Sequence, residues 1–83
     1  MSAGSRHRST RAAAIARVVV AENLIDARLS AGLSQKEAAK RFCGRSQATL
    51  SRIESAALDV TVGELVALGA VYAVPFSRLV EGI

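Results

Sequence analysis

The sequence predicts an all-α fold of five short helices, and three observations indicate it. Half of the 83 residues are hydrophobic, but most of these are small, with only two Phe, one Tyr and no Trp. Small apolar side chains suit closely packed helices better than a β-sandwich or barrel. The chain has one proline, Pro75, and few glycines, so long helices are rarely interrupted. Serine or threonine also precedes most of the helical patterns, as helix caps do.

The N-terminal part divides into an arm and a long helix. Residues 1–9 are polar and basic without apolar periodicity, and we expect a flexible basic arm. Residues 10–83 have the size of one small domain with one core. Ser9 or Thr10 is a suitable cap for a helix that begins near Arg11 and stops before Gly32. Its predicted buried face consists of Ile15, Val19, Leu24 and Ala27.

Two short helices with strong caps follow. Ser34, with Glu37 three residues later, forms a capping box for a helix over residues 35–42. Ser46 is the expected cap of the next helix, over residues 47–55. That helix has a single narrow apolar stripe, formed by Leu50 and Ile53. We therefore expect most of its surface to remain polar and exposed.

The last two helices are the most apolar. Thr61 and Glu64 form a second capping box, and the apolar residues predicted on one face are Val62, Leu65, Leu68 and Tyr72. Pro75 is expected to open a short fifth helix, because proline is tolerated at a helix start. The apolar residues of that helix are Phe76, Leu79 and Val80.

The charge favours a nucleic-acid partner and the composition excludes several other classes. The net charge is +4, and Arg outnumbers Lys nine to two. Guanidinium groups match phosphates and guanine edges well. One Cys and one His exclude an internal disulfide and an ordinary zinc site, so we expect a reducing, cytoplasmic setting and no cofactor. We also expect no enzyme, since no catalytic triad, phosphate loop or carboxylate cluster is present. Arg17 interrupts the first apolar run, which argues against a signal peptide or a membrane span.

The second and third predicted helices have the arrangement of a helix-turn-helix, in which the second helix of the pair enters the major groove of DNA. The segments GLSQKEAAKRF and SQATLSRIE resemble the Cro and phage-repressor type, or xenobiotic-response-element-like, family. The resemblance covers residues 24–80, and its last two helices are similar to actinobacterial members. It implies a compact, repressor-like five-helix domain that binds double-stranded DNA.

The resemblance implies roles for matching residues. The implied base contacts are Gln47, Ala48, Ser51 and Arg52. Gln47 has the donor and acceptor for adenine, and Arg52 has the fork for guanine. The implied phosphate contacts are Gln35, Lys36, Arg45, Ser46 and Thr49. Arg28 is implied to pair with Glu54 as a structural link. Plain solvation of Gln47, phosphate binding by Arg52 and an ordinary surface pair at Glu54 stay as alternatives.

The sequence departs from the family pattern at several places. The turn between the second and third helices is one residue longer, most simply by Cys43. Ala38 replaces the usual Leu, and Phe42 is a candidate to fill the space. The segment SAALDV after Glu54 has no basic residue. We expect the arm and Arg17 to supply phosphate contacts instead, through Arg6, Arg8 and Arg11 of the arm region, although an idle arm is an equal alternative.

Together these features favour a sequence-specific transcription regulator that acts as a Cro-like dimeric repressor on a two-fold operator. One alternative is an antitoxin that binds a toxin and represses its own promoter. Another is a protein-interaction module that has lost DNA binding. No effector pocket or second domain is expected after Ile83. The apolar residues predicted at the homodimer surface are Val71, Val74, Phe76, Leu79, Val80 and Ile83.

Overall fold

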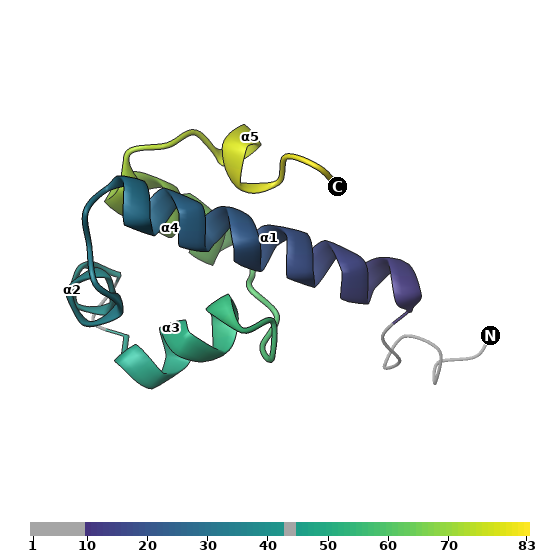
Figure 1. The fold of residues 1–83 in the computed structure, drawn as a ribbon, viewed down its shortest axis with the longest axis horizontal. Helices are drawn as coiled ribbons and strands as arrows, with labels where there is room; N and C mark the ends of the chain where they lie inside the picture. The colour runs from purple at the N-terminus through teal and green to yellow at the C-terminus, as the bar shows by residue number, and fades with distance from the viewer. Residues whose placement is uncertain (1–9, 43–44) are drawn as a thin grey trace.

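Five α-helices surround one core, and the computed structural model describes them over residues 10–42 and 45–83. They are α1 (Arg11–Ser30), α2 (Gln35–Arg41), α3 (Gln47–Glu54), α4 (Val62–Tyr72) and α5 (Phe76–Leu79). The longest helix, α1, crosses the molecule, with α2 and α3 on one side of it and α5 on the other (Figure 1). The described ranges contain no strand, which confirms the predicted all-α class. The predicted arm, with Arg6 and Arg8, and the extra turn residue Cys43 lie outside these ranges.

The ends of α1 follow local signals, but its buried face differs from the prediction. The Oγ1 atom of Thr10 accepts a hydrogen bond from the backbone N–H of Ala13 at 3.0 Å, which caps the helix. Gly32, with φ +74°, takes the left-handed conformation that follows many helix ends. The buried residues of α1 are Val20, Ala21, Leu24 and Ala27.

Two residues of the predicted α1 face were assigned wrongly. Ile15 is 57% exposed, and Val19 is only half-buried. The physical reason is visible in the ribbon, where the N-terminal part of α1 extends beyond the other helices (Figure 1). No residue of the range 11–19 is buried, because the neighbouring helices leave much of this part of α1 uncovered.

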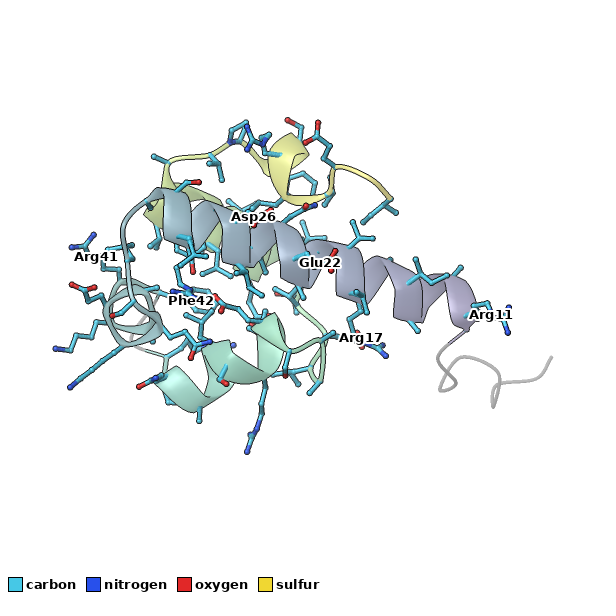
Figure 2. All side chains as sticks on the ribbon, in the orientation of Figure 1. Arg11, Arg17, Glu22, Asp26, Arg41 and Phe42 are labelled. Carbon is cyan, nitrogen blue, oxygen red and sulfur yellow. The ribbon has the colours of Figure 1, made fainter. Side chains whose placement is uncertain are left out.

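The two short helices have the predicted caps and end one residue earlier than predicted. Ser34 and Glu37 form the complete capping box of α2. Phe42 is the C-cap of α2 rather than its last residue, and Ser55 has the same place after α3. Phe42 is 1% exposed and lies among α1, α2 and α3, beside the fully buried Ala38 (Figure 2). The aromatic ring therefore contributes volume to the core in which Ala38 replaces a larger residue.

The capping box of Thr61 and Glu64 begins α4 as predicted. The predicted apolar face is correct for Leu65, Leu68 and Tyr72, which are at most 5% exposed. Val62 was predicted on the same face but is 67% exposed, because it occupies the first turn of α4, beyond the core. The hydroxyl of Tyr72 is buried without a hydrogen-bond partner among the described residues.

The segment after α4 is tied back to α1. Pro75 is the N-cap of α5, next to its predicted place as the opening residue. The Nδ2 atom of Asn23 in α1 donates hydrogen bonds to the carbonyl oxygens of Leu79 at 3.0 Å and Glu81 at 2.8 Å. The side chain of Leu79 is 1% exposed, so its prediction as a dimer-surface residue was wrong. It packs in the core of this chain instead.

Candidate nucleic-acid interface

The third helix, α3, lies below α1 in the view of Figure 1, and most of its exposed residues are polar. Its inward residues, Leu50 and Ile53, are at most 2% exposed and belong to the core. The four predicted base contacts, Gln47, Ala48, Ser51 and Arg52, are all exposed. The structure therefore brings these side chains together on one accessible face of one helix. Whether they contact bases stays a prediction.

The N-terminus of α3 is capped by the side chain of Ser46. The Oγ atom of Ser46 accepts a hydrogen bond from the backbone N–H of Thr49 at 3.2 Å. The two hydroxyl oxygens of Ser46 and Thr49 are 3.0 Å apart and share a hydrogen bond. Both residues were predicted to contact phosphate. In the structure the Ser46 hydroxyl caps the helix, which satisfies one of its free N–H groups, and the Thr49 hydroxyl bonds to that of Ser46.

The C-terminus of α3 is held by a buried ion pair. Arg28 of α1 donates two hydrogen bonds to the carboxylate of Glu54, at 2.7 Å to Oε2 and 3.1 Å to Oε1. The side chains are 12% and 4% exposed. Hydrogen bonding to Glu54 raises the pKa of Arg28 above its ordinary value. Because the pair is buried and bidentate, it fixes α1 and α3 relative to each other.

The second helix joins this network. Arg28 also donates a hydrogen bond to the carbonyl oxygen of Leu33 at 2.8 Å, just before α2. The Nε2 atom of Gln35, in the first turn of α2, donates to Oε1 of Glu54 at 2.9 Å. Gln35 was predicted to bind phosphate, and one of its two N–H donors is thus directed to the protein interior. Glu54 therefore connects three helices, with α2 and α3 held as one unit.

The predicted basic contacts lie in different environments. Lys36 is exposed on α2, and Arg11 is exposed at the tip of α1 (Figure 2). Arg45 instead forms an ion pair with Glu64 of α4 and lies over the ring of Phe42, 5.7 Å from its centroid. The sequence reasoning missed Lys40 and Arg41, two further exposed cations in the last turn of α2. Their position in a basic run on the same helix as Lys36 was the available signal.

The loop after α3 is held by a cation of α1, Arg17. Arg17 projects from α1 toward this loop (Figure 2), where its Nε donates a hydrogen bond to the carbonyl oxygen of Ala56 at 3.2 Å. Its Nη1 is 3.2 Å from Oδ1 of Asp59. Arg17 was expected to add phosphate contacts. Its contacts hold the loop against α1, with Ala56 at φ 63°.

The carboxylate of Glu64 is held from two sides. Its Oε1 accepts a hydrogen bond from the backbone N–H of Thr61 at 2.8 Å, and its Oε2 pairs with Arg45. The Thr61 backbone hydrogen bond, together with Arg45, lowers the pKa of Glu64 below its ordinary value. This carboxylate is therefore charged at neutral pH and keeps its place at the start of α4.

Comparison with known families agrees with this geometry. The sequence model of a family described as a helix-turn-helix domain matches residues 5–79, most of the chain. The protein belongs to this helix-turn-helix family. No curated protein and no solved structure gives a match.

In this helix-turn-helix domain, α2 and α3 are the paired helices, and α3 is the one whose polar face is exposed. Domains of this kind bind DNA by placing the second helix of the pair in the major groove. Over the described ranges, no helix is long and apolar enough to cross a membrane. The same residues contain no group of three His, Cys, Asp or Glu side chains that is arranged to hold a metal ion.

Proposed function

We propose that this helix-turn-helix domain is a sequence-specific transcription regulator, and that it is a repressor of the Cro type found in phages. The observation that carries the proposal is the exposed polar face of α3, on a helix whose opposite face is fully buried. Gln47 and Arg52 on this face have the donors and acceptors that distinguish adenine and guanine in the major groove. The proposal includes no catalytic role and places the protein in the cytoplasm, where bacterial DNA lies.

Selection of bound DNA from a random pool, followed by footprinting of the selected sequence, tests this function. A regulator selects a discrete site, and its affinity falls steeply as salt is raised, because bound phosphates release counterions. Recovery of no preferred sequence would contradict the proposal. Repression is tested separately by placing the selected site over a promoter and measuring transcription with and without the protein.

We further propose that the regulator binds as a homodimer, because one α3 contacts too few base pairs for useful specificity. A mostly apolar groove of about 310 Å³ lies between α1 and the C-terminal half of the chain. Its lining includes Val20, Val60, Leu65, Phe76, Val80 and Ile83. The charged side chains in the lining, Arg17 and Asp59, pair with each other, so the groove suits an apolar partner such as the same surface of a second copy.

Sedimentation of single variants tests this interface. Ile83 is 70% exposed at the groove, and Leu29 is 61% exposed at the far end of α1. Ile83→Glu is expected to shift the protein toward a monomer, since a charge would be buried in an apolar contact. Leu29→Glu is the matched control and is expected to leave the assembly unchanged. A monomer on a full operator, with one protected patch, would contradict the dimer.

One observation favours a second function, that of a protein-interaction module. The loop between α3 and α4 has no basic residue, and Arg17 beside it is paired with Asp59. Phosphate contacts from this side are therefore fewer than the family resemblance implies. Binding with little salt dependence to any DNA, together with a tight protein partner, would support this second function.

A further inference from the structure

The residue that precedes the α3 cap, Arg45, is fixed at both its backbone and its side chain. Its backbone N–H donates a hydrogen bond to the carbonyl oxygen of Phe42, the C-cap of α2, at 2.9 Å. Its guanidinium lies 5.7 Å from the centroid of the Phe42 ring. At this separation a cation is attracted to the face of an aromatic ring. Since Phe42 is a core residue, the backbone and the guanidinium of Arg45 both contact the same buried residue.

The ion-pair partner of Arg45, Glu64, is also held in position by a backbone hydrogen bond. Glu64 lies in the first turn of α4, where the backbone N–H of Thr61 holds its second carboxylate oxygen. The side chain of Glu64 is 17% exposed, against 44% for Arg45. A carboxylate that is fixed in this way gives the cation a single preferred direction. The pair therefore links the start of α3 to α4, across 19 residues of sequence.

The other cations of this surface differ from Arg45. Lys36 on α2 and Arg52 on α3 are exposed, and within the described residues neither side chain has an ion-pair partner. Such side chains are available to a phosphate without losing a protein contact. Arg45 would have to leave both a carboxylate and an aromatic ring to bind one.

We propose that Arg45 is a positioning residue for α3 rather than a phosphate ligand, and that Glu64 holds it in this role. The inference rests on the proposed DNA-binding function and assigns Arg45 a role different from the phosphate contact that the family resemblance implied. The link fixes the leading end of α3, where Gln47 and Ala48 face outward. Loosening it moves the base-contacting side chains while the number of phosphate contacts stays the same.

The test measures the affinity of the full chain for its selected operator at several salt concentrations. Glu64→Gln keeps an oxygen that can accept the Thr61 hydrogen bond but removes the charge that holds Arg45. We expect Glu64→Gln and Arg45→Gln each to weaken binding about two- to fivefold at low salt, which is the effect of losing one exposed ion pair, and by less as salt screens the pair. The double variant is expected to bind no more weakly than either single variant, because both changes break the same link.

The salt slope distinguishes positioning from phosphate binding. Lys36→Gln is the matched control and is expected to lower the slope by about 0.9, the value for one lost phosphate contact. Arg45→Gln is expected to change the slope no more than Glu64→Gln does, because both changes remove the same pair. A slope lowered by about 0.9 in Arg45→Gln, or tighter binding by Glu64→Gln, would show that Arg45 binds phosphate and would overturn the inference. A wild-type chain that selects no sequence would instead refute the proposed function itself.

A readout in the free protein completes the test. If the pair positions α3, Arg45→Gln and Glu64→Gln both speed amide hydrogen exchange at Thr49 and Leu50, whose N–H groups bond to Ser46, whereas Lys36→Gln does not. Unchanged exchange in both variants would also overturn the inference, because a link that holds the helix must slow its opening.

Discussion

The two ends of α3 are held by ion pairs that differ in burial and in geometry. At the C-terminal end, Glu54 is 4% exposed and accepts two hydrogen bonds from Arg28 and a third from Gln35. At the N-terminal end, Arg45 is 44% exposed and has one carboxylate partner, Glu64. A buried charge depends on its partner for folding, whereas an exposed one retains water as an alternative. The C-terminal pair therefore determines stability, and the N-terminal pair adjusts the direction of the helix.

The largest effect is a loss of stability, expected at the C-terminal end of α3, where the ion pair is buried. Glu54→Ala leaves the guanidinium of Arg28 without its carboxylate and should lower the free energy of unfolding by about 3–5 kcal/mol. Urea denaturation measures this loss. Glu81→Ala is the matched control, because its pair with Arg78 spans 3.9 Å between exposed side chains. Equal midpoints for the two variants would show that burial does not distinguish the two kinds of pair.

The next largest effect is a loss of operator binding, and it concerns the exposed side chains between the two ends of α3. Gln47→Ala and Arg52→Ala should each weaken operator binding by about 1–3 kcal/mol and relax the preference at one or two base pairs. Binding to a panel of single-base operator variants measures both changes. Ser30→Ala, at the exposed end of α1, is expected to alter neither. An equal loss on every operator would mean that the two side chains contact phosphate only.

A smaller effect on stability is expected at the leading end of α3. Ser46→Ala removes the side-chain oxygen that accepts the N–H of Thr49, at a cost of about 1 kcal/mol in unfolding free energy. Thermal denaturation provides the measurement, and Ser77→Ala on the exposed side of α5 serves as the reference. If the two variants melt together, the cap contributes nothing and the start of α3 is held by Arg45 alone.

The smallest expected effect is a gain in stability, in the loop just after the C-terminus of α3. Ala56 has φ 63°, a conformation that costs a residue with a Cβ more than glycine. Ala56→Gly should therefore raise the unfolding free energy by about 0.5–1 kcal/mol. Ala57→Gly, one residue later, lacks this positive φ and is expected to lower stability. Destabilisation by both glycines would show that the loop carries no strain at Ala56.

The caps were predictable from the sequence because their signals are local. Ser34 and Thr61 each precede a glutamate at the third helical position, and the structure has both capping boxes. The outward face of α3 was equally predictable, since Leu50 and Ile53 leave only one orientation for a helix this short. In both cases residues close together in the sequence determine the structure.

The errors arose where distant parts of the chain decide the outcome. Ile15 and Val62 fit the apolar periodicity, yet each lies beyond the reach of the core. Periodicity gives the direction of a side chain along a helix but does not show where the neighbouring helix ends. The pairing of Arg45 with Glu64 joins elements that are 19 residues apart, and no local pattern indicates it. Because Arg45 is a cation, the sequence predicts a phosphate contact, and that contact stays a prediction beside the pairing with Glu64.

Tyr72, with its buried hydroxyl, gives the core one group that both absorbs near-ultraviolet light and titrates. Tyr72 is the chain's one tyrosine, and there is no tryptophan, so near-ultraviolet absorption above the phenylalanine bands comes from this ring. Burial, and to a lesser extent the charge of Glu54, raises the pKa of Tyr72 from 10.0 to about 12. A raised pKa favours the protonated form in the folded state, so this contribution to stability is complete below pH 10 and is lost as the pH rises toward about 12. Between these values the phenolate forms more readily in unfolded than in folded molecules, so alkali draws the chain toward unfolding through this one buried hydroxyl.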